Sequence, residues 1–173
     1  MKKDYIMKVD FEKAKEEAER ALRDARYLDP PVDPEEIAEG LGVPVRYATF
    51  EEPISSQVRG LITFEGELRI IINKAIPARE KIVTIAHELG HYLLHREWAE
   101  SNDYRVMLRG YHPESAALKE EQEADYFAEN LLVPYDMLAQ WRRILPVREL
   151  ATLFTVPDSV IYKRLRELDQ RNK

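Results

Sequence analysis

The stretch TIAHELGHYLLH (84–95) contains two histidines four residues apart, and a glutamate directly follows the first of them. Residues four apart lie on one face of a helix with Cβ atoms about 5–6 Å apart, so two imidazoles at this spacing can hold one metal ion. The motif therefore predicts a helix in which His87 and His91 are metal ligands. Glu88 is then expected to accept a proton from an attacking water and to pass it to the leaving amine of a cleaved peptide.

The residues around the motif bear on the alternative, an ordinary amphipathic helix with two unrelated histidines. Most of the neighbouring positions are apolar, namely Ile82, Val83, Ile85, Ala86, Leu89, Leu93 and Leu94. This predicts a largely buried helix, in which a carboxylate without a partner would cost free energy. A metal site explains why Glu88 is there, so we favour the metal-binding interpretation.

A catalytic zinc commonly has three protein ligands and one open position. His95 continues the four-residue spacing, but three histidines so spaced extend over about 12 Å along a helix axis, too far for one ion. We therefore predict that His95 is structural or orients a ligand. His112 lies in a segment without periodicity, and little supports it as a ligand.

Carboxylates in EEQEADYFAENLLVP (120–134) are better candidates for the third ligand. Glu121 and Asp125 are one helical turn apart, so Glu121 could complete the site while Asp125 holds the far nitrogen of a ligating histidine. Spacing alone leaves Glu120 and Glu123 as alternatives for the ligand. The other interpretation is a solvated acidic helix start, because acidic residues are common near helix N-termini.

Composition narrows the chemistry further. The chain has no cysteine, which excludes disulfides, a thiol nucleophile and a cysteine-based zinc site. Imidazole and carboxylate ligands predict zinc and also admit manganese or iron. The net charge of −6 is unlike that of most nucleic-acid-binding proteins. The N-terminus is too charged for a secretory signal and no apolar stretch reaches membrane-spanning length, so a cytoplasmic location is expected.

Hydrophobic periodicity and turn residues predict an α+β fold. Strands are expected at 43–50, 59–66 and 67–74, with a tight hairpin between the last two. Asp33 followed by Pro34 predicts a helix start. Residues 51–57 are expected to form a loop and 97–117 an irregular segment. Helices are expected at 8–27, 35–42, 79–96, 114–132, 136–143, 147–154 and 157–168.

The C-terminal segment VRELATLFTVPDSVIYKRLREL (147–168) has the apolar pattern of a helix-turn-helix, with a predicted core of Leu150, Ala151, Phe154, Val156, Val160 and Leu165. Lys163, Arg164 and Arg166 on its second helix could contact the major groove of DNA. We favour a helical pair that packs on the core or docks a substrate, because the chain is acidic and the basic residues are few. Pro146 is predicted to divide a domain of residues 1–145 from an appendage of residues 146–173.

The motifs TIAHELGHYLLH and EQEADYFAENLLVP together resemble those of the ImmA/IrrE family of metallo-endopeptidases. The upstream VDPEEIAEGLGVPV and the strand ending in IIN are also similar, and the resemblance covers roughly residues 30–168. It implies a zincin-like core, in which a small antiparallel sheet packs against the motif helix and a glutamate helix. It also implies zinc held by His87, His91 and Glu121 with Glu88 catalytic. The E-x-x-x-D pattern of glutamate-zincins makes its first acid the ligand and leaves a supporting role for Asp125.

The resemblance implies a substrate as well, because members of this family cleave helix-turn-helix repressors and so relieve repression. Two other functions stay open: a DNA-binding regulator whose metal site is a sensor or structural, and a toxin-linked or broad-specificity protease. Substrate selection is expected in 97–117. Candidates for stabilising the oxyanion are Tyr104, Tyr111, His112 and Tyr126.

Overall fold

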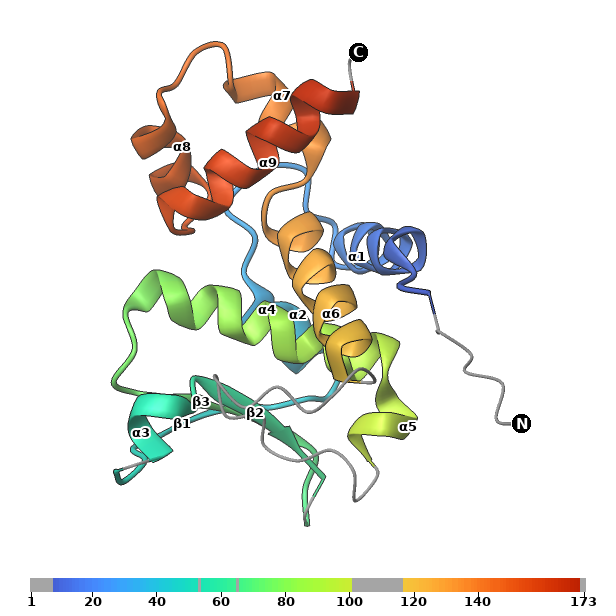
Figure 1. Cartoon of the computed structure of the whole chain (residues 1–173), viewed down its shortest axis with the longest axis vertical. Coiled ribbons are helices and arrows are strands. Elements are labelled where there is room, and N and C mark those ends of the chain that lie inside the picture. The colour runs from blue at the N-terminus through green and yellow to red at the C-terminus, as the bar shows by residue number, and fades with distance from the viewer. Residues whose placement is uncertain (1–7, 53, 65, 101–116, 172–173) are drawn as a thin grey trace, which may run out of the picture.

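The computed structural model describes residues 8–52, 54–64, 66–100 and 117–171. Its elements form layers, with a small sheet below, helix α4 lying across it, and α6 and α1 on the other side of α4 (Figure 1). The helices are α1 (Phe11–Asp24), α2 (Pro34–Gly40), α3 (Ile54–Gln57), α4 (Ala78–Leu94), α5 (Arg96–Ala99), α6 (Ala117–Leu132), α7 (Tyr135–Trp141), α8 (Val147–Leu153) and α9 (Asp158–Arg171). The strands are β1 (Val45–Ala48), β2 (Gly60–Thr63) and β3 (Arg69–Asn73). The mixed α+β composition agrees with the sequence-based expectation.

The sheet has the strand order β1-β3-β2, with β3 in the centre. Val45, Ile70 and Ile62 are register partners across the three strands, and all three are buried. They form one apolar row, and a sheet with such a face is stable only when another element covers it. Helix α4 lies across the sheet and supplies that cover (Figure 1).

The predicted antiparallel sheet was wrong in one pairing. The hairpin of β2 and β3 is antiparallel, as expected, and Gly66 adopts a positive φ of 77° in its turn. However, β1 runs parallel to β3. The chain leaves β1, forms the short helix α3 where a loop was expected, and places β2 on the far side of β3. This crossover makes β1 and β3 parallel neighbours, a pairing that adjacent strands joined by a tight turn cannot adopt.

Glycines allow α4 to approach both of its neighbours closely. A side chain at Gly60 in β2 would place its Cβ 2.6 Å from Thr84 Cγ2 on α4. On the opposite side, a Cβ at Gly90 would lie 3.2 Å from the Cα of Ala124 and 3.0 Å from a ring carbon of Phe127, both on α6. Small residues at a helix crossing permit this short separation, so Gly90 brings the motif helix directly against α6.

Local capping explains where the first two helices begin. The side chain of Asp10 accepts a hydrogen bond from the backbone N–H of Lys13 at 3.0 Å, at the start of α1. Asp33 accepts from Glu35 N and Glu36 N at the start of α2, with Pro34 in the first turn. The helix start predicted at Asp33 and Pro34 is therefore confirmed, because an N-cap carboxylate satisfies N–H groups that lack partners within the helix.

The C-terminal helical pair is fastened to α6 and α4. The guanidinium of Arg164 is buried and donates to the backbone oxygen of Val133 and to Asn130 Oδ1, each at 3.0 Å. Arg79 at the start of α4 donates to Thr152 Oγ1 at 2.9 Å. The apolar residues of the pair that are buried belong to the same core cluster as those of α4 and α6. These contacts agree with a pair that packs on the core, while the domain division at Pro146 stays a prediction.

Two further expectations need correction. Val160 and Leu165, predicted for the core of the second C-terminal helix, are partly buried and pack against the core, whereas the buried residues of this helix are Ile161, Arg164 and Leu168. Residues 96–99 form α5 at the start of the segment expected to be irregular. The remainder of that segment, residues 101–116, lies outside the described residues. None of the described helices is long and apolar enough to cross a membrane.

Candidate metal centre

Three side chains that the sequence singled out as ligands meet where α4 crosses α6. His91 Nε2 lies 3.0 Å from His87 Nε2 and 2.9 Å from Glu121 Oε1, and His87 Nε2 lies 3.4 Å from Glu121 Oε2. His87 and His91 come from consecutive turns of α4, and Glu121 projects from α6. The three side chains form a group that could hold a metal ion.

The geometry of this group fits a divalent metal. In a tetrahedral zinc site with bonds of about 2.0–2.1 Å, neighbouring ligand atoms lie about 3.3 Å apart. The three donor–donor distances, 2.9, 3.0 and 3.4 Å, are close to that value. Two imidazoles and one carboxylate also leave a fourth position for a water or a substrate oxygen, as catalytic zinc sites require.

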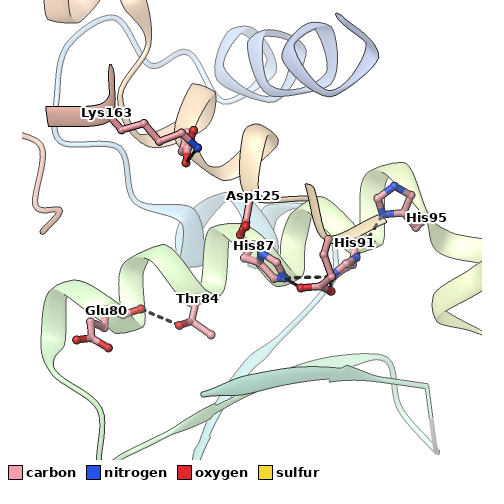
Figure 2. A network of polar contacts seen from close by, with 9 residues as sticks. Glu80, Thr84, His87, His91, His95, Asp125 and Lys163 are labelled. Carbon is pink, nitrogen blue, oxygen red and sulfur yellow. Dashed lines mark hydrogen bonds and ion pairs between the residues drawn. The ribbon is translucent and has the colours of Figure 1, made fainter. Parts of the chain in front are cut away.

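Asp125 lies on the outer side of His87. Its Oδ1 is 2.8 Å from His87 Nδ1, and Figure 2 shows the carboxylate directed at the ring. A carboxylate only accepts hydrogen bonds, so Nδ1 carries a proton and donates it, which leaves Nε2 as the nitrogen that can bind an ion. This nitrogen faces His91 and Glu121. The contact agrees with the orienting role expected for Asp125, although 63% of the Asp125 side chain is exposed.

The charges of the group are distributed unevenly. Burial lowers the pKa of His87, but its hydrogen bonds with Asp125 and Glu121 outweigh this effect and raise its pKa well above the usual value. Burial lowers the pKa of His91 to about 4. Burial favours a raised pKa for Glu121, but the hydrogen bonds with the two histidines lower its pKa overall. The group therefore combines a carboxylate whose pKa is lowered with one histidine whose pKa is raised and one whose pKa is lowered.

Glu88 follows His87 on α4 and is only 6% exposed. Its negative charge contributes to the raised pKa of His87, which places its carboxylate electrostatically close to the metal group. It is not one of the three grouped ligands. Its burial beside the site is what the sequence predicted, and its catalytic role stays a prediction.

Glu120 and Glu123, the alternatives to Glu121 as the third ligand, are not part of the group. Glu123 points instead at His95, whose Nε2 lies 2.8 Å from Glu123 Oε2. His95 Nδ1 in turn lies 3.2 Å from His91 Nδ1, so His95 borders a ligand without reaching the ion position (Figure 2). This agrees with the expectation that His95 is structural or orients a ligand.

Sequence reasoning missed the pairing of His95 with Glu123, although a signal was present. His91 and His95 are four apart on one helix, and Glu121 and Glu123 are two apart on the other, so two histidine–glutamate pairs can form across one crossing.

Tyr126, a candidate for oxyanion stabilisation, packs its ring against Phe11 at 4.9 Å between centroids. The other candidates, Tyr104, Tyr111 and His112, lie outside the described residues.

Three comparisons relate this chain to known proteins. A peptidase family model described as the IrrE N-terminal-like domain matches residues 38–166. A search of curated proteins gives no match. Among solved structures, one described as a Mycobacterium tuberculosis transcriptional regulator has a TM-score of 0.63 and 16% sequence identity, covering 89% of this chain and 46% of that one. The chain thus spans about half the length of that relative, and at this identity the likeness concerns the fold.

The family match spans most of the chain and includes the motif helix, the glutamate helix and most of the C-terminal pair. The family is one of metal-dependent peptidases, which agrees with a group of His87, His91 and Glu121 that could hold an ion. The chain belongs to the peptidase family of the IrrE N-terminal-like domain.

Proposed function

We propose that this chain is a zinc-dependent endopeptidase that cleaves a helix-turn-helix repressor. The observation that carries the proposal is the convergence of His87 Nε2, His91 Nε2 and the Glu121 carboxylate, with separations that suit a tetrahedral ion. Membership of a metallopeptidase family supports the same chemistry. Zinc is preferred on its ligand set, while manganese and iron accept the same donors.

A bound zinc supplies Lewis-acid chemistry, polarising a peptide carbonyl and lowering the pKa of a water molecule to about 7. Glu88 accepts the proton of the attacking water and then delivers it to the nitrogen of the leaving amine. Its burial beside His87 supports this role, because a buried carboxylate exchanges protons with groups in the site and not with bulk water. His87, held by Asp125, keeps its Nε2 lone pair directed at the ion position.

Access to the centre is one-sided. The side chain of His91 is 2% exposed, whereas those of His87 and Glu121 are 17% and 29% exposed. A peptide therefore reaches the centre from the side of His87 and Glu121, while His91 lies on the protein side. The assignment of a repressor as the substrate rests on the resemblance of the motifs to the ImmA/IrrE family.

The test is incubation of the purified protein with the helix-turn-helix protein encoded beside it, followed by mass spectrometry of the fragments. Wild-type protein with zinc or manganese is expected to cut at a defined bond, and the chelated protein is expected to cut nothing. A Glu88→Gln variant that cleaves as fast as wild type would contradict the assignment of the base. Absence of cleavage with every metal and every neighbouring repressor would refute the proposed function.

The second candidate is a DNA-binding regulator in which the metal site is a sensor. One solved structure with a similar fold is described as a transcriptional regulator. Two of the basic residues assigned to DNA contact are engaged elsewhere, because Arg164 is buried and Lys163 Nζ lies 2.6 Å from Glu129 Oε1. We therefore expect only weak, salt-sensitive DNA binding. Tight sequence-specific binding that is lost on joint replacement of Lys163 and Arg166 by alanine would favour the regulator.

A further inference from the structure

A buried hydrogen-bonded chain leads away from the metal group on the side opposite to Asp125. It runs from His91 Nδ1 to His95 Nδ1 at 3.2 Å, and from His95 Nε2 to Glu123 Oε2 at 2.8 Å. The other oxygen of Glu123 accepts the backbone N–H of Asp10 at 2.6 Å. The side chains of His95 and Glu123 are 7% and 6% exposed. Four residues from three segments thus form one continuous path out of the site.

With an ion on His91 Nε2, the chemistry of the chain fixes the direction of each hydrogen bond. Glu123 ends the chain as a carboxylate and can only accept, so His95 Nε2 carries a proton and donates it. In the neutral ring His95 Nδ1 is then the acceptor, so His91 Nδ1 must be the donor. The remaining nitrogen, His91 Nε2, lies between His87 Nε2 and Glu121 Oε1, so it is the atom that offers its lone pair to an ion held by the three side chains.

We propose that His95 and Glu123 are positioning residues of the metal centre, which hold His91 in the tautomer and ring orientation that present Nε2 to the ion. The inference rests on the metal site of the proposed function. It assigns the two ligating histidines two different supports. Asp125, largely exposed, orients His87, whereas the buried pair of His95 and Glu123 orients His91.

The surroundings of the pair favour an orienting role over simple space-filling. The Trp98 ring lies 5.3 Å from that of His91 and 6.3 Å from that of His95, so α5 closes the pair from outside. A buried polar pair costs stability unless each partner is satisfied, and an apolar pair would fill the same volume without that cost. What the polar pair adds is a defined proton position on His91.

The test replaces His95 by phenylalanine and, separately, by glutamine. Phenylalanine keeps an aromatic ring beside Trp98 but has no nitrogen. Glutamine has an oxygen that can accept from His91 Nδ1 and an amide that can donate to Glu123. Zinc affinity is measured by competition with a chelator. Proton–nitrogen NMR of the zinc-loaded protein shows whether the Nδ1 proton of His91 is held in a hydrogen bond, and Asp125→Ala serves as the matched control.

In the wild type we expect the Nδ1 proton of His91 to be held in a hydrogen bond. His95→Phe is expected to remove this hydrogen bond and to weaken zinc binding about 10–100-fold, the usual range for loss of such a support, and His95→Gln to recover most of the loss. Asp125→Ala should disturb His87 and leave the hydrogen bond of His91 unchanged. A His95→Phe protein with wild-type zinc affinity would overturn the inference.

If His95→Phe does not fold, a zinc-loaded wild type whose His91 Nδ1 proton makes no hydrogen bond overturns the inference equally. Neither the NMR nor the affinity measurement needs cleavage, so both separate this inference from the proposed endopeptidase activity. A protein that binds zinc and loses affinity in His95→Phe, yet cleaves no repressor, would support the positioning pair and refute the endopeptidase.

Discussion

Asp125 Oδ1 lies 2.8 Å from His87 Nδ1, and this contact joins the exposed face of α6 to the more accessible of the two ligating histidines. Since the carboxylate accepts the Nδ1 proton, the opposite nitrogen of the ring is free to bind an ion. The contact is open to solvent, so its contribution is screened and reduced compared with that of a buried pair.

The first prediction concerns this contact. Asp125→Ala should weaken zinc affinity by about tenfold, at the lower end of the usual range for an orienting carboxylate, because the Asp125 side chain is mostly exposed. Chelator competition measures the change. The control is Asp136→Ala, another acidic residue on an exposed helix surface, which should bind zinc as wild type does. An unchanged dissociation constant in Asp125→Ala would show that the aspartate is only a surface acid.

The second prediction addresses the ligands themselves. The wild type should bind close to one zinc per chain, and His87→Ala and Glu121→Ala should each lose most of it, since two donors do not complete the site. Elemental analysis of dialysed protein gives the stoichiometry. Glu120→Ala removes the neighbouring carboxylate, which is outside the group, and should retain the metal. Full retention in both ligand variants would remove the basis for the metal centre.

The third prediction separates catalysis from binding. Glu88→Gln keeps the shape of the side chain and removes the base, so zinc content should be retained while the cleavage rate falls about 10²–10⁴-fold. Single-turnover cleavage of the repressor measures the rate. The matched control is Glu97→Gln on α5, an exposed glutamate that should leave the rate unchanged. Loss of zinc from the Glu88 variant would instead indicate that Glu88 is a ligand.

The fourth prediction is a pH dependence of zinc affinity. The pKa of His87 is raised well above its usual value, so near neutral pH the metal must displace a proton from this ring. His91, with a pKa of about 4, is already neutral there. Affinity should therefore rise with pH up to the His87 pKa, about tenfold per pH unit, with release of about one proton per ion.

Calorimetry in buffers of different ionisation enthalpy counts the released protons. Asp125→Ala removes the first of the hydrogen bonds that raise the His87 pKa, so this variant should release fewer protons at the same pH. Equal proton release by wild type and variant, or affinity that does not depend on pH, would contradict the raised pKa of His87.

The fifth prediction concerns Arg164, which donates to Val133, Asn130 and Glu167 from a fully buried position. Arg164→Ala leaves the backbone oxygen of Val133 and Asn130 Oδ1 without this buried donor and should lower the free energy of unfolding by about 3 kcal/mol. Denaturation in urea measures the loss. Arg166→Ala, two residues along on the exposed side of α9, should change stability by less than about 0.5 kcal/mol.

The metal group could be predicted from the sequence because the residue spacing that defines it is local. Helical periodicity alone puts His87 and His91 on one face, and the spacing of Glu121 and Asp125 puts both on one side of the second helix. The hairpin of β2 and β3 is equally local, since a tight turn dictates antiparallel pairing. The choice of Glu121 over its neighbours needed the resemblance to a family, because the angle between two helices cannot be read from either one.

The parts that escaped prediction depend on pairing over long distances. The parallel pairing of β1 with β3 follows from the placement of β2 beyond β3, which no strand pattern encodes. Arg164 occupies a core position between Ile161 and Leu168, and its charge suggested a surface role. Two of its acceptors, Val133 and Asn130, lie more than 30 positions earlier, on and just after α6. The sequence did contain a signal for this burial, because Arg164 shares the helical spacing of the apolar residues Ile161 and Leu168.

The hydrogen bond from the backbone of Asp10 to Glu123 has a consequence for the motions of the protein. Helix termini open and close locally, and the first turn of α1 starts at this residue. When that turn opens, Glu123 loses a partner, and the support of His91 loosens with it. Coupling of this kind is reciprocal, so an ion held by His91 stabilises the closed turn in return. The N-terminal helix precedes the segment shared with the family. We therefore expect its first amides to exchange hydrogen more slowly when the metal is bound.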